Sequence, residues 1–146
     1  MNQFLKGVLA CCIVIVLTSC KQSSTNTQPD KLIQPDKVVV ERLDPLHQSA
    51  VHFEKSVADK EVVETLYDKI LSLPLFPQGP INCPNDNGVQ YELTFTLESQ
   101  KVSKAVVRAT GCQGITMNDK TYWAMEPKGN GFIALLMHDI GLSDSR

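Results

Sequence analysis

Residues 89–98 read Val89-Gln90-Tyr91-Glu92-Leu93-Thr94-Phe95-Thr96-Leu97-Glu98, five apolar side chains that alternate strictly with five polar ones. Because successive side chains of a β-strand point to opposite faces, this period of two predicts a strand with one buried and one solvated face. A turn at 99–101 leads into a second strand at 102–109, which carries apolar side chains on both faces. That pattern favours a central position in the sheet.

The segments around this hairpin supply the rest of the fold. Four shorter strands are predicted as two hairpins, at 38–43 with 50–54 and at 115–117 with 121–125. Two helices are predicted from apolar residues at helical spacing, at 59–73 and 131–140. Consecutive short hairpins favour antiparallel pairing. The chain therefore predicts a single α+β domain, an antiparallel sheet of about five or six strands with both helices packed on one face.

The helix ends carry their own signals. Asp59 is a good N-cap for the first helix, and Pro74 ends it. Asn130 is the expected N-cap of the second helix, and Gly141 is expected to terminate it.

The first twenty residues have the organisation of an export signal. A basic head at 1–6 precedes an apolar run at 8–17, and small residues follow. The run is too short to cross a bilayer, since a spanning helix needs about 20 apolar residues. It is therefore expected to be removed.

Leu17-Thr18-Ser19-Cys20 resembles the lipobox of bacterial lipoproteins, in which a leucine, a small or β-branched residue and a small residue precede a cysteine. The resemblance implies cleavage after Ser19 and a diacylglyceryl thioether, with palmitate-type chains, on Cys20. It also implies a protein of the bacterial cell envelope that is lipid-anchored to the membrane and faces outward. The alternative is an ordinary secretory signal that is cut nearby.

Composition divides the chain into a signal peptide at 1–19, the lipidated Cys20 with a flexible tether at 20–36, and a globular domain at 37–146. The tether is rich in Ser, Thr, Asn, Gln and Pro and cannot bury enough apolar area to fold. With 14 Lys and Arg against 16 Asp and Glu, the chain has a net charge of −2 and no basic footprint for nucleic acid. The expected partners are the membrane, through the lipid on Cys20, and an envelope protein.

Two of the five cysteines are expected to pair. Cys11 and Cys12 lie in the signal and Cys20 takes the lipid, which leaves Cys83 and Cys112 outside the membrane. An even pair there favours a disulfide, which would close a loop of about 30 residues and contribute about 3.5 kcal/mol in the chain-entropy model. The predicted hairpin brings both sulfurs to the same end. Without a CxxC spacing, the pair is at best half a zinc site.

The body of the chain also resembles small, uncharacterised envelope lipoproteins of bacteria. The resemblance covers about 30 residues, through Cys83-Pro84, Tyr91-x-Leu93-x-Phe95 and Gly111-Cys112. It implies no particular activity.

Candidate catalytic groups are few. His52 and Glu54 would share a strand face and could form a two-ligand metal site, but a solvent-facing pair is preferred because no third ligand can be named. His138 and Asp139 are adjacent on a predicted helix, where side chains diverge by about 100°, so they are not expected to act as an acid-base pair. Residues 85–88 resemble part of a calcium loop, and a tight turn is preferred. The chain lacks the common hydrolase, zinc, phosphate and dinucleotide motifs, so we expect no enzyme, catalytic residue, metal or cofactor.

Residues 73–81 are apolar and contain three prolines, with Cys83 just beyond. We expect this segment either to cover the core, which is preferred, or to offer Leu75, Phe76 and Pro77 to a partner. Three functions follow. The first is a non-enzymatic binding or envelope-support module of unknown ligand, acting through a sheet edge or this segment. The second is a small extracellular protease inhibitor that presents residues 73–81, and the third is an envelope enzyme with an unrecognised site.

Overall fold

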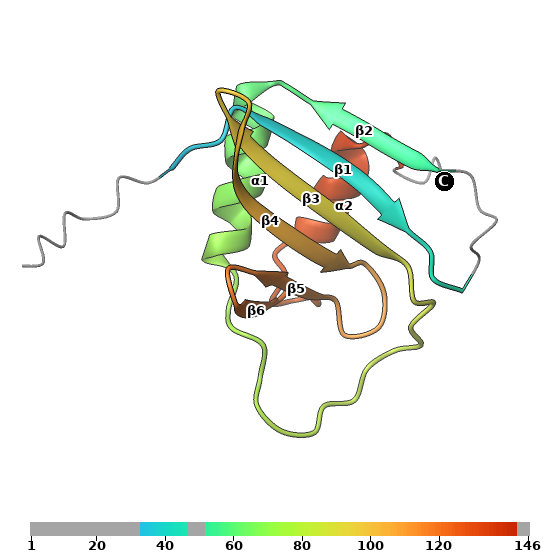
Figure 1. Ribbon diagram of the computed structural model, residues 1–146. Coiled ribbons are helices and arrows are strands. Elements are labelled where there is room, and N and C mark those ends of the chain that lie inside the picture. Colours follow the sequence, from blue (N-terminus) through green and yellow to red (C-terminus); the bar gives the residue numbers. More distant parts are fainter. Residues whose placement is uncertain (1–32, 47–51, 143–146) are drawn as a thin grey trace, which may run out of the picture. The chain divides into compact units, whose positions relative to one another are not determined.

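The computed structural model describes residues 33–46 and 52–142 (Figure 1). Its elements follow the expected order β-β-α-β-β-β-β-α. The strands are β1 (Lys37–Leu43), β2 (Phe53–Val57), β3 (Gln90–Leu97), β4 (Gln100–Arg108), β5 (Gly114–Met117) and β6 (Lys120–Trp123), and the helices are α1 (Lys60–Ser72) and α2 (Phe132–Asp139).

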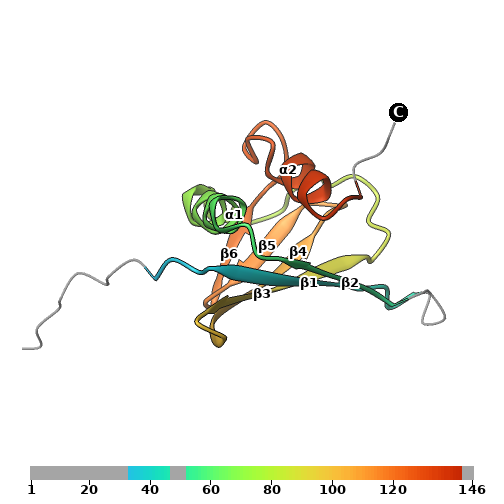
Figure 2. The same cartoon turned by 90° about the horizontal axis from the view of Figure 1, so that it is seen from above.

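The six strands form one antiparallel sheet in the order β2-β1-β3-β4-β5-β6. β3 and β4 lie at its centre, and for β4 this is the position that its apolar pattern predicted. Both helices lie over the same face of the sheet, which we call the inner face (Figure 2). The predicted α+β class with a single domain is therefore confirmed.

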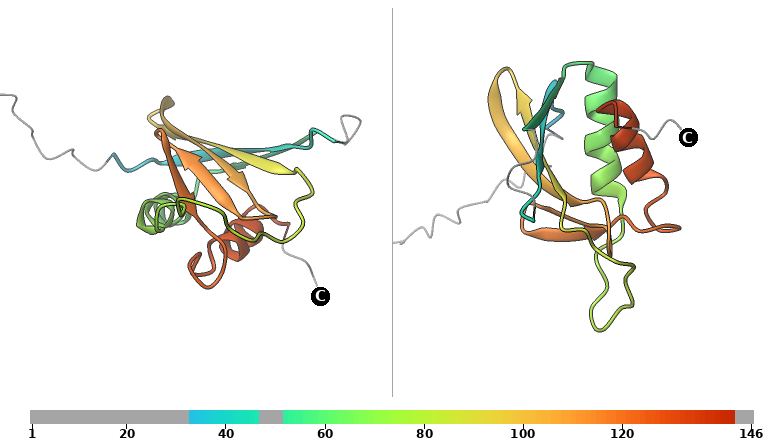
Figure 3. Two further views of the ribbon diagram at one scale, coloured as in Figure 1. Left: turned by 90° about the horizontal axis from the view of Figure 1, so that it is seen from below. Right: turned by 90° about the vertical axis from the view of Figure 1, so that its right-hand side faces the viewer.

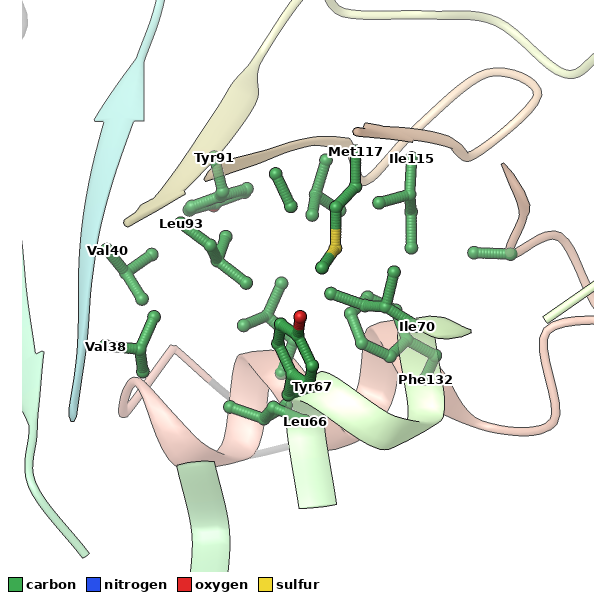
Figure 4. Packing of buried hydrophobic residues seen from close by; sticks show 14 of the residues in the cluster. Val38, Val40, Leu66, Tyr67, Ile70, Tyr91, Leu93, Ile115, Met117 and Phe132 are labelled. Atoms are coloured by element: carbon green, nitrogen blue, oxygen red, sulfur yellow. The ribbon is translucent and has the colours of Figure 1, made fainter. Parts of the chain in front are cut away.

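The hydrophobic core fills the space between the helices and the inner face (Figure 4). Tyr91, Leu93 and Phe95 on β3 are buried, and the polar residues between them are not. Leu97, the last apolar residue of the alternation, is 36% exposed because it lies at the end of the strand. The helices contribute fully buried side chains from Val63, Leu66, Ile70, Phe132 and Leu136.

Two strand connections are tight two-residue turns. Glu98 and Ser99 join β3 to β4 with φ of 49° and 67°, and Asn118 and Asp119 join β5 to β6 with φ of 49° and 61°. Positive φ at both central residues is the signature of the type I′ turn, whose twist matches that of the flanking strands. The first turn was expected at 99–101 and begins one residue earlier.

β2 ends at Val57, three residues beyond the predicted end at 54, and residues 50 and 51 of the predicted strand lie outside the described residues. Arg42 pairs with Phe53 and Val38 pairs with Val57, which places Phe53 and Val57 on the inner face, where both are partly buried. The predicted end was wrong because Lys55 and Ser56 are polar and interrupt the apolar pattern of the sequence.

Three of the four helix ends are as the sequence predicted. Asp59 accepts hydrogen bonds from the backbone N–H groups of Glu61 (3.1 Å) and Val62 (3.3 Å). At the end of α2, Gly141 has φ of 76° and its N–H donates to His138 (3.0 Å), while the N–H of Leu142 donates to Met137 (2.7 Å), a Schellman motif. α1 ends before Pro74, as expected.

The prediction of Asn130 as the N-cap of α2 was wrong. Gly131 occupies the cap position with φ of 73°, and no side chain caps the helix from that residue. Instead, the N–H of Gly131 donates to Oε1 of Glu126 at 2.5 Å. The carboxylate of Glu126 thus binds the N–H of the cap residue itself and not those of the first helical turn.

Several expectations lie outside the described residues. These are the signal peptide, the lipobox with Cys20, most of the tether and residues 50–51 of the strand predicted at 50–54. Pro35 and Asp36, the last residues of the expected tether, contact the domain: Pro35 is buried, and Asp36 accepts a hydrogen bond from the N–H of Glu98 at 2.9 Å. Neither helix in the described part of the chain is long and apolar enough to span a membrane.

Candidate binding surface

A disulfide joins Cys83 to Cys112, with the two Cα atoms 4.9 Å apart. Cys83 precedes β3 and Cys112 follows β4, so the bridge lies at the end of the central hairpin opposite its turn. The predicted pairing is confirmed. The disulfide fixes the loop that connects α1 to β3 against the sheet.

The start of that loop is hydrogen-bonded to the edge of the sheet. The N–H of Trp123 donates to the carbonyl of Pro74, and the N–H of Phe76 donates to the carbonyl of Thr121, both at 2.8 Å. Leu75 forms an isolated bridge with Tyr122. Residues 74–76 therefore extend the sheet beyond β6 by one short strand, which we call the edge segment.

The three residues expected at a partner contact differ in exposure. Leu75 is 62% exposed, whereas Phe76 and Pro77 are half-buried and Leu73 is buried. The ring of Phe76 meets that of Trp123 edge-to-face, with centroids 6.5 Å apart. Leu73 and Phe76 cover neighbouring side chains, as expected of a core cover, whereas Leu75 faces solvent. A shallow hollow beside Leu75 is lined by residues 75–79 and 119–121.

A groove of about 410 Å³ lies on the outer face of the sheet, between β4, β5, β6 and the loop. We call it the outer groove; it is lined by Phe76, Ile81, Cys83, Pro84, Asp86, Arg108, Gly111, Cys112, Gly114, Thr116 and Thr121. At Gly114 no side chain enters the groove. A Cβ there would lie 3.5 Å from the Phe76 ring and 3.6 Å from a methyl of Thr121.

Asp86 is the charged residue that the loop brings to this groove. Its Oδ1 accepts hydrogen bonds from the N–H of Gly88 (2.9 Å) and the hydroxyl of Thr110 (2.8 Å). These two bonds, followed by the charge of Arg108, hold the pKa of Asp86 below its usual value. The carboxylate therefore stays ionised at neutral pH. The bond to Gly88 is an Asx turn, in agreement with the turn preferred for residues 85–88.

We predict that Gly111→Ala destabilises the protein by about 2–3 kcal/mol. Gly111 has φ of 62°, and a Cβ there would lie 2.9 Å from the Cβ of Asp86. Chemical denaturation measures the loss. Gly141→Ala is the control, since Gly141 has φ of 76° with nothing within 4 Å, and should lose only the cost of the left-handed backbone, about 1 kcal/mol. Equal losses would show that Asp86 is not seated over Gly111.

His52 and Glu54, the candidate metal pair, lie exposed at the surface. Nε2 of His52 lies 3.8 Å from Oε2 of Glu54, as their shared face predicted, with side chains 72% and 52% exposed. Glu54 lies opposite Glu41, and Glu41 opposite Glu92, so three carboxylates line up across the outer face. Neither hollow described above includes them. Within residues 33–46 and 52–142, no three His, Cys, Asp or Glu side chains are placed to hold a metal ion.

His138 and Asp139 correct an expectation. Nδ1 of His138 lies 3.0 Å from Oδ1 of Asp139, although adjacent helical side chains leave the axis in different directions. The contact forms because α2 ends at Asp139, and the side chain of His138 is 76% exposed there. No candidate nucleophile is in contact with the pair among the described residues.

Sequence reasoning found the disulfide and the apolar segment but missed the outer groove. Arg108, Thr116 and Thr121 looked like ordinary solvent-facing residues of strands, and Gly114 looked like a turn signal. Comparison with protein-family models, with curated proteins and with solved structures finds no match for this chain.

Proposed function

We propose that this protein is a lipid-anchored, non-enzymatic binding module of the bacterial envelope that contacts a partner protein through the edge segment. The anchor is the lipid expected on Cys20 of the lipobox. The observation that carries the contact is the 62% exposure of Leu75 on a backbone fixed by two hydrogen bonds of 2.8 Å.

The fixed backbone matters for affinity. A large apolar side chain in solvent is favourable to bury, worth about 1.5–3 kcal/mol for a leucine. Binding by a mobile loop would lose part of this gain to ordering, whereas a preformed segment avoids that cost. Sheet pairing through Pro74 and Phe76 on one side and the disulfide on the other support the segment in one conformation.

A protease inhibitor is the second candidate, and the loop between α1 and β3 favours it. The loop projects from the body of the domain beyond β5 and β6 (Figure 3). Gln78, Gly79 and Pro80 are exposed at its far side. Stoichiometric inhibition of an extracellular protease, lost on changing Gln78 or Pro80, would favour this function over the first.

We predict that Leu75→Asp lowers capture of the partner from crosslinked, intact membranes by about tenfold or more, because a charge replaces about 1.5–3 kcal/mol of apolar contact. The measurement is quantitative mass spectrometry of proteins co-purified with the tagged, full-length chain. Phe76→Asp should act in the same direction, but through loss of the contact with Trp123 as well.

Leu46→Asp is the matched control, since Leu46 is 68% exposed and lies elsewhere on the domain. A protein captured by the wild type and by Leu46→Asp, but not by Leu75→Asp, supports the proposal. Identical capture by all three would mean that the edge segment is not the contact surface.

A further inference from the structure

The outer groove combines one cation, one carboxylate oxygen and an apolar wall. Arg108 lines the groove from the end of β4, and the loop brings Asp86 to it. In the described part of the chain, neither a hydrogen bond nor an ion pair occupies the guanidinium of Arg108. Both hydrogen bonds that Asp86 accepts from neighbours go to Oδ1. Its Oδ2 accepts none from the residues that the structure describes.

This pair of charges defines the ligand chemistry. A guanidinium presents a planar fork of donors that matches a carboxylate or a phosphate. The negative charge of Asp86 nearby opposes a doubly charged phosphate and tolerates a single carboxylate. Oδ2 of Asp86 is an acceptor for an N–H that lies beside that carboxylate.

The shape of the groove adds two further requirements. Phe76, Ile81 and Pro84 form an apolar wall of a size that suits one side chain. A volume of about 410 Å³ is within the range of sites for small ligands. The groove is open to solvent and not enclosed, so the rest of a longer ligand can leave it. A fatty acid would need an enclosed apolar tunnel instead.

We infer that the outer groove binds the carboxy-terminal end of a peptide chain with an apolar last residue. The terminal carboxylate pairs with Arg108, the last backbone N–H donates to Oδ2 of Asp86, and the last side chain contacts Phe76 and Ile81. The inference rests on the proposed function as a binding module, and it names the part of the partner that is recognised. Phe76 belongs to both the edge segment and the groove, so a partner could contact Leu75 with its body while its terminus occupies the groove.

The test uses the fluorescence of the purified full-length protein, in which Trp123 is the one tryptophan. Its ring touches that of Phe76, so a ligand against Phe76 changes its emission. The probes are two N-acetylated tetrapeptides that end in leucine and differ only in a free carboxylate or an amide at the C-terminus. We expect saturable binding of the acid, and binding of the amide that is weaker by about tenfold or more.

Two variants locate the site. Arg108→Gln should weaken the acid-ended peptide by about tenfold or more and leave the amide unchanged. Gly114→Val should abolish binding by filling the groove, and it introduces no backbone strain, because the φ of Gly114 is not in the left-handed region. Circular dichroism checks its fold. If that variant does not fold, Arg108→Gln and the amide peptide decide the outcome.

Four results would overturn the inference: no saturable change with the acid, equal affinity for acid and amide, no effect of Arg108→Gln, or competition by inorganic phosphate at the affinity of the peptide. Leu75→Asp separates this inference from the proposed function. Peptide binding should survive that change, whereas partner capture should not. If Leu75→Asp loses partner capture but the wild type binds no peptide, the edge-segment contact is supported and the inference about the groove is rejected.

Discussion

Cys20→Ser is expected to abolish stable attachment of the protein to the membrane. Each buried methylene contributes about 0.8 kcal/mol, a single acyl chain gives a membrane association constant of only about 10⁴ M⁻¹, and two chains anchor stably. Serine offers no thiol for the thioether, so both chains are lost together. The wild type should partition into the detergent phase and yield an acylated amino-terminal peptide in mass spectrometry. The variant should yield no acylated peptide.

Cys11→Ser and Cys12→Ser are the matched controls, because both cysteines lie inside the apolar run of the expected signal. Each should leave the acylated peptide unchanged. An amino terminus other than Cys20 in the native protein, or a peptide without acyl chains, would refute the lipoprotein assignment. The binding function would then have to operate from a freely diffusing domain.

Most of the sheet could be predicted from the sequence, because a strand with one buried face has apolar residues at every second position. β3 has one face against the helices, and its strict alternation follows from that geometry. The roles of Asp59 and Gly141 at the helix ends were predicted because each depends on the local backbone alone. Asp59 accepts a hydrogen bond from a free N–H, and Gly141 adopts a positive φ. β2 was misplaced because both faces of this edge strand are largely exposed, so its pattern carries little information.

The candidate sites could be predicted only where residues close together in the sequence, or joined by one hairpin, make up the site. Cys83 and Cys112 are paired by the hairpin between them, and residues 73–81 are recognisable by composition alone. The outer groove could not be predicted, because its lining comes from the loop, three strands and the turn after β4. At Gly114 no side chain enters it. Asp86 and Arg108 are 22 residues apart in the sequence, and both line the groove at the disulfide-linked end of the hairpin.

Phe95→Ala is expected to destabilise the domain by about 3–5 kcal/mol, the range for phenylalanine in a packed core. The Phe95 side chain is 0% exposed. Its ring meets that of Tyr67 on α1 edge-to-face, with centroids 5.1 Å apart and planes at 76°. The substitution would therefore remove transfer free energy, leave a cavity between sheet and helix, and lose an aromatic contact worth about 0.5–1.5 kcal/mol. Guanidinium denaturation followed by circular dichroism and Trp123 fluorescence measures the change.

Thr94→Ala is the control that makes this result informative about the alternation. Thr94 is the neighbour of Phe95 on β3 but faces away from the helices, and it is only half-buried. Its replacement should cost less than about 1 kcal/mol, as for a surface position of a strand. Because domains of this size have about 5–15 kcal/mol of stability in total, the two variants should be clearly resolved. Similar losses for both would mean that the two faces of β3 are not distinguished by burial, and the helices would then have to be placed elsewhere on the sheet.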